Sequence, residues 1–263
     1  MSPGCDQCYA ETFAERFRGV EGHPYEQGFD LRLAPKKLLE PLQMEKPRRI
    51  FVNSMSDMFH GRIPTEYIRD IANVMMAAPW HIYQVLTKRS GRMRRLFQND
   101  PTMRKAAQAE HIWWGVSAEN HRHGAPRIEH LREASVAHPW VSFEPLLEDM
   151  SDVPIDGIQW AIVGGESGWE YRPLVYEHVI HMRDRCKELG IPFFFKQWGG
   201  LPKNKSHRDL DGQTYDEQPE FPHAVAVPRK KRHELIDTFT AEFRQRWGSK
   251  IREPDRPTVE TAG

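Results

Sequence analysis

The sequence predicts an α/β protein built as a partial (β/α) TIM-like barrel of parallel strands. Short apolar runs alternate with amphipathic helical patterns from Ile50 to Phe195, which is the order that produces a parallel sheet. Polar residues gather directly after the apolar runs, at the strand ends where parallel barrels bind ligands. Both observations favour a barrel with a ligand site on one face.

The elements follow from periodicity along the chain. Apolar runs predict strands at 49–53, 81–87, 112–116, 140–143, 158–163 and 192–196. Helical spacing predicts helices at 12–17, 65–77, 90–97, 122–134 and 177–189, the last closed by Gly190 at the usual C-terminal position. Beyond Leu201 the alternation ends. We therefore divide the chain into a barrel domain over 1–200 and an irregular extension over 201–263, with a short helix at 235–247 and a disordered end from 252.

Length and charge limit the kinds of protein that this chain can be. The chain has 263 residues, enough for one large α/β barrel or two small domains. Lys plus Arg and Asp plus Glu are 37 each, so global charge gives no argument for a nucleic-acid coat or a membrane surface. No run approaches the roughly 20 apolar residues of a membrane span, and Met1–Cys5 has no secretory pattern. We expect no membrane association and a cytoplasmic location.

The three cysteines are Cys5, Cys8 and Cys186, and an odd count argues against a disulfide framework. Cys5 and Cys8 have the Cys-x-x-Cys spacing that metals, clusters and redox sites share. Zinc would need a second pair of ligands, which the sequence does not offer at a comparable spacing. A cluster with one open iron needs three cysteines, and only two are close. Cys186 falls in a helical pattern, where we expect a buried thiol.

Polar side chains follow each predicted strand, and we expect them to converge on one concave face because parallel strands end together. Each could instead form a structural salt bridge. The residues are Asn53, Ser54 and Asp57; Thr87, Lys88 and Arg89; Ser117, Glu119 and Asn120; Glu144; Gly164, Gly165 and Glu166; and Lys196, Gln197 and Trp198.

Several motifs carry a family resemblance. They lie at 2–11 (Ser-Pro-Gly-Cys-Asp-Gln-Cys-Tyr-Ala-Glu), 47–60, 84–89, 114–120, 142–147, 163–168 and 193–200. Over Met1 to about Pro219, the chain resembles a phage-associated "three-cysteine-motif" family of uncharacterised proteins, itself similar to radical S-adenosylmethionine enzymes. Leu86-Thr87-Lys88 also resembles spore photoproduct lyase-like enzymes, a weaker likeness.

The resemblance implies an iron–sulfur enzyme of phage or mobile-element origin that uses a [4Fe-4S] cluster and S-adenosylmethionine, with a nucleic acid or nucleotide as the candidate substrate. It implies Cys5 and Cys8 as cluster ligands and Lys88, Glu144 and Lys196 as catalytic residues. The cofactor-binding residues that it implies are Tyr9, Asn53, Ser54, Asp57, Ser117, Glu119, Asn120, Gly164, Gly165 and Glu166.

One departure from the family pattern concerns the N-terminus. Members usually carry a first cysteine several residues upstream of Ser-Pro-Gly-Cys, after an initial strand, whereas this sequence begins inside the motif. The resemblance therefore implies that the first barrel strand and one cluster ligand are missing, leaving the cluster incomplete. We favour a late start over a degenerate copy, because every downstream motif is intact.

A second hypothesis is a non-redox module on the same barrel that binds a nucleic acid or a partner protein. Lys88, Arg89, Arg92, Arg94 and Arg95 form a local basic stripe able to meet phosphates. Aromatic residues nearby could stack on bases. A brown protein with a reducible absorption band would favour the enzyme, and a colourless protein that binds oligonucleotides would favour the module.

Overall fold

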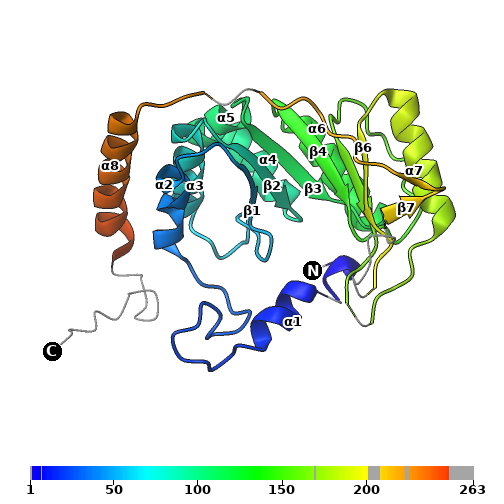
Figure 1. Ribbon diagram of the computed structural model, residues 1–263, viewed down its shortest axis with the longest axis horizontal. Coiled ribbons are helices and arrows are strands. Elements are labelled where there is room, and N and C mark those ends of the chain that lie inside the picture. Colours follow the sequence, from blue (N-terminus) through cyan, green and yellow to red (C-terminus); the bar gives the residue numbers. More distant parts are fainter. Residues whose placement is uncertain (1, 7, 169, 201–207, 223–224, 249–263) are drawn as a thin grey trace.

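The computed structural model describes residues 2–6, 8–168, 170–200, 208–222 and 225–248. Six strands form one sheet, and their bounds are β1 Arg49–Val52, β2 Ile82–Thr87, β3 Ile112–Ser117, β4 His138–Phe143, β5 Ala161–Gly164 and β6 Phe193–Gln197. Each strand pairs in parallel with the next strand along the chain, in the order β1-β2-β3-β4-β5-β6. The sheet curls into a half-barrel (Figure 1), which confirms the predicted partial barrel.

Helices cover the convex side of this sheet. They are α3 Thr65–Ala77, α4 Ser90–Asn99, α5 Pro101–Ala107, α6 His121–Glu133 and α7 Tyr176–Leu189. Their apolar faces and the outward residues of the strands, such as Val85, Trp114 and Phe195, make up the larger hydrophobic core. Helix α5 was not predicted. Asp100 caps it by accepting from the backbone N–H groups of Thr102 and Met103, and Pro101 occupies its first turn.

A second, aromatic core lies on the opposite, concave side. Because side chains alternate along a strand, Trp113 points away from Trp114, and it joins Trp140, Trp160 and Ile82 there. Phe221 packs against this cluster, with its ring 5.0 Å from that of Trp113. The concave side is thus filled by indole rings near the amino ends of the strands, and its polar residues lie at the carboxyl ends.

The N-terminal segment runs outside the sheet. It contains a 3-10 turn, η1 Pro3–Cys5, then α1 Tyr9–Glu15, η2 Pro35–Leu39 and α2 Glu40–Gln43. Helix α1 begins three residues before the predicted start at 12. Figure 1 shows the N-terminal turn near the arrowheads of the strands, which are their carboxyl ends.

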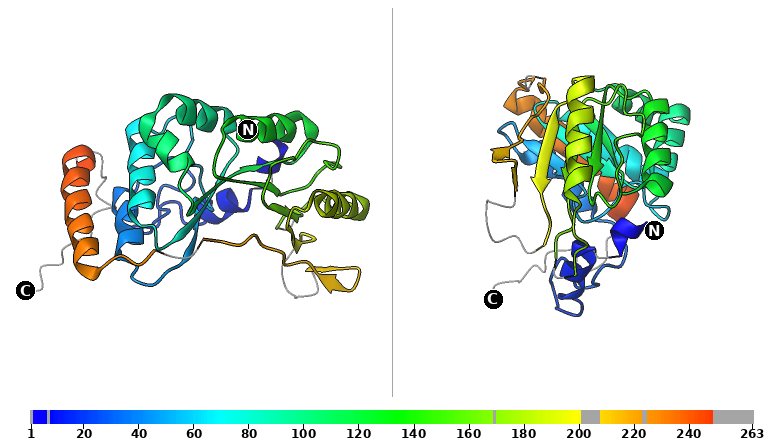
Figure 2. Two further views of the ribbon diagram at one scale, coloured as in Figure 1. Left: turned by 90° about the horizontal axis from the view of Figure 1, so that it is seen from above. Right: turned by 90° about the vertical axis from the view of Figure 1, so that its right-hand side faces the viewer.

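The C-terminal segment returns across the molecule. After the hairpin β7 Asp209–Leu210 and β8 Gln213–Thr214, Tyr215 accepts a backbone hydrogen bond from Phe195 of β6 at 2.9 Å. Helix α8, Arg229–Trp247, begins six residues before the predicted start and packs beside α2 and η2 (Figure 2). Residues 252–263, predicted to be disordered, lie outside the described residues. No helix in the described ranges is long and apolar enough to cross a membrane.

Candidate active site

The carboxyl ends of the six strands, which we call the barrel mouth, bring together many of the predicted polar residues. Lys88 follows β2 and lies 2.5 Å from Glu119, which follows β3. Lys196 of β6 lies 2.9 Å from Glu144, which follows β4. Glu166, after β5, lies within electrostatic range of Lys88. Charged side chains from five neighbouring strand ends therefore share one face, as the sequence predicted.

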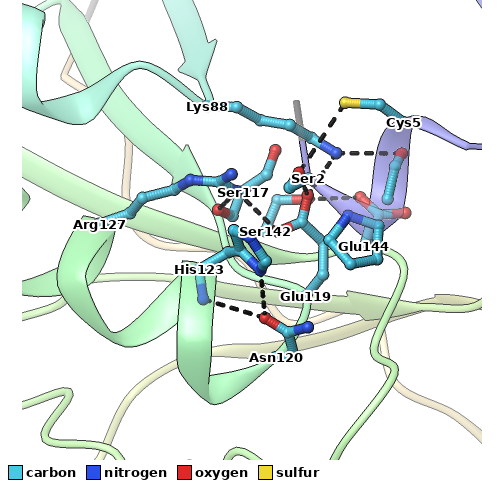
Figure 3. A network of polar contacts seen from close by, with 12 residues as sticks. Ser2, Cys5, Lys88, Ser117, Glu119, Asn120, His123, Arg127, Ser142 and Glu144 are labelled. Atoms are coloured by element: carbon cyan, nitrogen blue, oxygen red, sulfur yellow. Dashed lines mark hydrogen bonds and ion pairs between the residues drawn. The ribbon is translucent and has the colours of Figure 1, made fainter.

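Glu119 is the centre of this network (Figure 3). Its side chain is fully buried and accepts from Ser2 Oγ at 2.7 Å, from Arg127 at 2.7 Å and from Lys88. Burial by itself would raise the pKa of Glu119, but the charges of Lys88 and Arg127 outweigh burial and hold that pKa below its ordinary value. Glu119 is therefore an ionised carboxylate that joins three segments of the chain.

Lys196 and Glu144 form a second pair, which is more open to solvent. The second oxygen of Glu144 accepts from Ser142 Oγ at 2.9 Å, and the Lys196 side chain is 54% exposed. The charge of Glu144 raises the pKa of Lys196. The exposed ring of Tyr9 lies within electrostatic range of both residues, and its hydroxyl donates to the Ser54 carbonyl at 2.8 Å. This pair can offer both a charged donor and a carboxylate to a ligand.

Glu166 forms a third pair, with Arg172, a residue that the sequence did not single out. Arg172 Nε lies 2.9 Å from one oxygen of Glu166. Burial alone would raise the pKa of Glu166, but the hydrogen bonds from Arg172 outweigh burial and hold that pKa below its ordinary value. The preceding glycines serve packing here. A Cβ on Gly165 would lie 2.1 Å from the Trp198 carbonyl oxygen, and one on Gly164 would lie 3.1 Å from Glu144.

The described residues Ser2–Asp6, which we call the cysteine turn, lie on the barrel mouth. Ser2 reaches Glu119, the Gly4 carbonyl accepts from Lys88 Nζ at 3.1 Å, and the Pro3 carbonyl accepts from Arg172 at 2.7 Å. Cys5 and Cys8 are both half-buried free thiols. The first part of the cysteine motif therefore lies against the polar strand ends.

Most of the other predicted cofactor-binding residues form hydrogen bonds with the protein's own groups. Asp57 accepts from Thr87 Oγ1 at 2.8 Å, from Arg89 at 2.9 Å and from backbone N–H groups of Phe59 and Lys88. Asn120 caps helix α6, and the Ser117 carbonyl accepts from Arg127. The Asn53 amide nitrogen donates to Ser56 within its own turn, whereas the Asn53 Oδ1 atom is buried without a hydrogen-bond partner among the described residues. In the structure these residues stabilise the loops and helix ends around the barrel mouth.

The described residues offer at least one ligand too few for a complete metal centre. The thiols of Cys5 and Cys8 are soft ligands of the kind that iron–sulfur clusters use. Within the described ranges, however, no group of three His, Cys, Asp or Glu side chains could hold a metal ion. Cys186 is fully buried in α7, as predicted, and burial raises its pKa to about 12. A complete cluster would need a ligand from outside the described residues.

The basic stripe that suggested a phosphate-binding module is largely neutralised. Arg89 pairs with Asp57, and Arg94 pairs with Glu133 of helix α6. Arg92 donates to the backbone carbonyls of His60 and Ile63. With Lys88 held by Glu119, four of the five predicted basic side chains have partners within the protein, and the module hypothesis stays a prediction.

Sequence reasoning missed the residues that complete the charge pairs. Glu166 is contacted by Arg172, and Glu144 is contacted by Ser142. Glu119 is contacted by both Arg127 and Ser2. Ser2 is 117 positions from Glu119 in the chain. Such a pairing has no local pattern, because only the folding of the whole chain brings the two segments together.

Comparisons with known proteins give a family but no activity. The model of the family "Protein of unknown function (DUF5131)" matches residues 1–219. No curated protein sequence matches the chain. Among solved structures, the chain is similar to the catalytic domain of a mannanase from Streptomyces sp. SirexAA-E, at 12% identity and a TM-score of 0.32, with 81% of this chain and 68% of that chain covered. A likeness at that TM-score carries no argument.

Proposed function

The chain belongs to this family of unknown function (DUF5131). We propose that it is a radical S-adenosylmethionine-like iron–sulfur enzyme of phage or mobile-element origin. One observation carries the proposal. The Cys-x-x-Cys motif begins in a turn that contacts the barrel mouth through Ser2, Pro3 and Gly4. A metal centre on this motif would therefore lie at the face where parallel barrels carry out their chemistry.

In this proposal Cys5 and Cys8 supply two thiolate ligands, and the remaining ligand comes from outside the described residues. A cluster of this type, together with S-adenosylmethionine, supplies hydrogen-atom abstraction. The protein's own groups bind and orient the reactants. Glu119 stays ionised beneath the cysteine turn, where its negative charge pairs with Lys88 and Arg127.

In this proposal the Lys196–Glu144 pair contacts the substrate. The half-exposed Lys196 ammonium can donate to a phosphate or carboxylate oxygen, and Glu144 can accept from a hydroxyl or amino group. The exposed ring of Tyr9 nearby offers a surface for a planar base. These features support a nucleotide or nucleic acid as the substrate class.

The test is anaerobic reconstitution with ferrous iron, sulfide and an excess of a small thiol that can serve as a ligand. Iron and sulfide per chain should rise well above the value without the thiol. Cys5→Ala and Cys8→Ala should abolish the rise, whereas Cys186→Ala should leave it unchanged, because Cys186 is enclosed in α7. Iron uptake that survives both N-terminal substitutions would contradict the proposal.

The alternative module is tested with the same preparation before iron is added. A colourless protein that takes up no iron yet binds oligonucleotides, with an affinity that falls steeply as salt rises, would favour a phosphate-binding module over the enzyme.

A further inference from the structure

We propose that Lys88 and Arg172 are positioning residues that fasten the cysteine turn to the barrel mouth. They would thereby control the accessibility of the Cys5 thiol in the turn and of the Cys8 thiol, which lies two residues beyond it at the start of α1. This role of the turn in holding a metal centre rests on the proposed function.

The cysteine turn has no apolar anchor. Pro3–Cys5 has no buried residue, the one buried residue of the turn is the polar Ser2, and the nearest buried apolar side chains, Ala10 and Ala14, belong to α1. Hydrophobic burial, which fixes most elements of a fold, therefore contributes little to holding this turn. Its position depends on polar contacts.

Two cations make the main contacts by donating to consecutive carbonyls. Lys88 Nζ lies 3.1 Å from the Gly4 oxygen, and Arg172 Nη2 lies 2.7 Å from the Pro3 oxygen. Each cation is itself held by a carboxylate, Glu119 or Glu166, whose side chain is no more than 6% exposed. Hydrogen bonds from a charged donor are stronger than neutral ones, so removing either cation should loosen the turn.

Gly4 shows how closely the turn fits the mouth. A Cβ at this position would lie 2.7 Å from Glu119 Oε1 and 2.8 Å from Lys88 Nζ. Any side chain larger than hydrogen would have to displace the ion pair or lift the turn. The fit gives a way to release the turn without removing a charge.

The experiment measures the reaction of each cysteine with a maleimide that carries a bulky polyethylene glycol chain, resolved by site with mass spectrometry. Lys88→Met and Arg172→Met should each raise the rates at Cys5 and Cys8 by about tenfold or more, the factor expected when a charge-assisted hydrogen bond is lost. The control Arg94→Met removes an ion pair on the outer helices and should leave both rates unchanged. Rates are compared on the plateau of a pH profile, so that altered thiol ionisation does not enter.

Cys186 serves as an internal reporter of unfolding, because it is fully buried in α7. Faster reaction at Cys5 and Cys8 with Cys186 still protected supports the proposal, and unchanged rates at both N-terminal thiols overturn it. If Cys186 reacts in step with the other two, the variant has unfolded, and Gly4→Ala decides by the same criterion. No metal is added, so this result is independent of whether the protein binds iron.

Discussion

Glu119 shows how much of the site depends on single buried charges. It has no exposed surface, yet it accepts from Ser2, Lys88 and Arg127 in three segments of the chain. A buried carboxylate is tolerated only when it is paired and fully hydrogen-bonded. Its loss would leave two cations unpaired at the mouth.

We expect Glu119→Gln to lower the free energy of unfolding at pH 7 by about 3 kcal/mol, the range measured when one partner of a buried ion pair is removed. Urea titrations followed by circular dichroism measure this change. Glu129→Gln, which alters an exposed ion pair on α6, is the matched control and should change stability by less than about 0.5 kcal/mol.

The lowered pKa of Glu119 predicts how the stability of the protein changes in acid. The pKa values of Glu119 and Glu166 lie below their ordinary value of 4.5 in the folded protein. Their contribution to stability is therefore fully present above that value and is lost as pH falls through the lower folded pKa values. Unfolding free energies measured from pH 6 to pH 3 should fall, and the fall should be shallower in Glu119→Gln. An identical slope in the two proteins would contradict this assignment.

Gly165 is a position where the fold requires the absence of a side chain. We expect Gly165→Ala to destabilise the protein by about 2 kcal/mol or more, because its Cβ would lie 2.1 Å from the Trp198 carbonyl. Gly61→Ala is the control, since no atom lies within 4 Å of the added Cβ there. Thermal unfolding of the two variants side by side makes the comparison.

The C-terminal segment packs against the aromatic core on the concave side of the sheet. Trp160 Nε1 donates to the Glu217 carbonyl at 3.0 Å, and Phe221 packs on Trp113 and Trp160. We expect Phe221→Ala, which removes a partly buried ring, to cost about 2 kcal/mol of stability, below the range for fully buried rings. Tryptophan fluorescence should shift to the red as indole rings meet water. Phe29→Ala, a matched change at a ring that is 41% exposed, should do neither.

Periodicity predicted most strands and helices because each carries its own apolar pattern. The prediction for α3, 65–77, agrees with the structure at both ends. Helix α5 was missed although Asp100-Pro101 is a good helix start, because its seven residues are too few to establish a helical period. β5 begins three residues later than predicted.

The candidate site was predictable only in outline. Strand ends placed Lys88, Glu119, Glu144 and Lys196 on one face, because parallel strands must end together. Their partners were beyond sequence reasoning, since Arg172 contacts Pro3 across 169 positions. Asp57 and Asn120 have the residue types of a binding site but accept from the protein's own turns.

The whole molecule is a half-barrel whose polar mouth is covered by a turn without an apolar anchor. Stability resides in the indole-rich concave core and the outer helices. The cysteine motif is attached to this rigid base by charge pairs at the mouth. The site can therefore change while the barrel remains folded.

Electron paramagnetic resonance of the reconstituted, reduced protein, with and without S-adenosylmethionine, tests whether the two N-terminal thiols hold a cluster that binds this cofactor. We predict an iron–sulfur signal that requires both Cys5 and Cys8 and changes shape when S-adenosylmethionine is added. A signal that is absent, that persists in Cys5→Ala and Cys8→Ala, or that S-adenosylmethionine leaves unchanged would contradict the account.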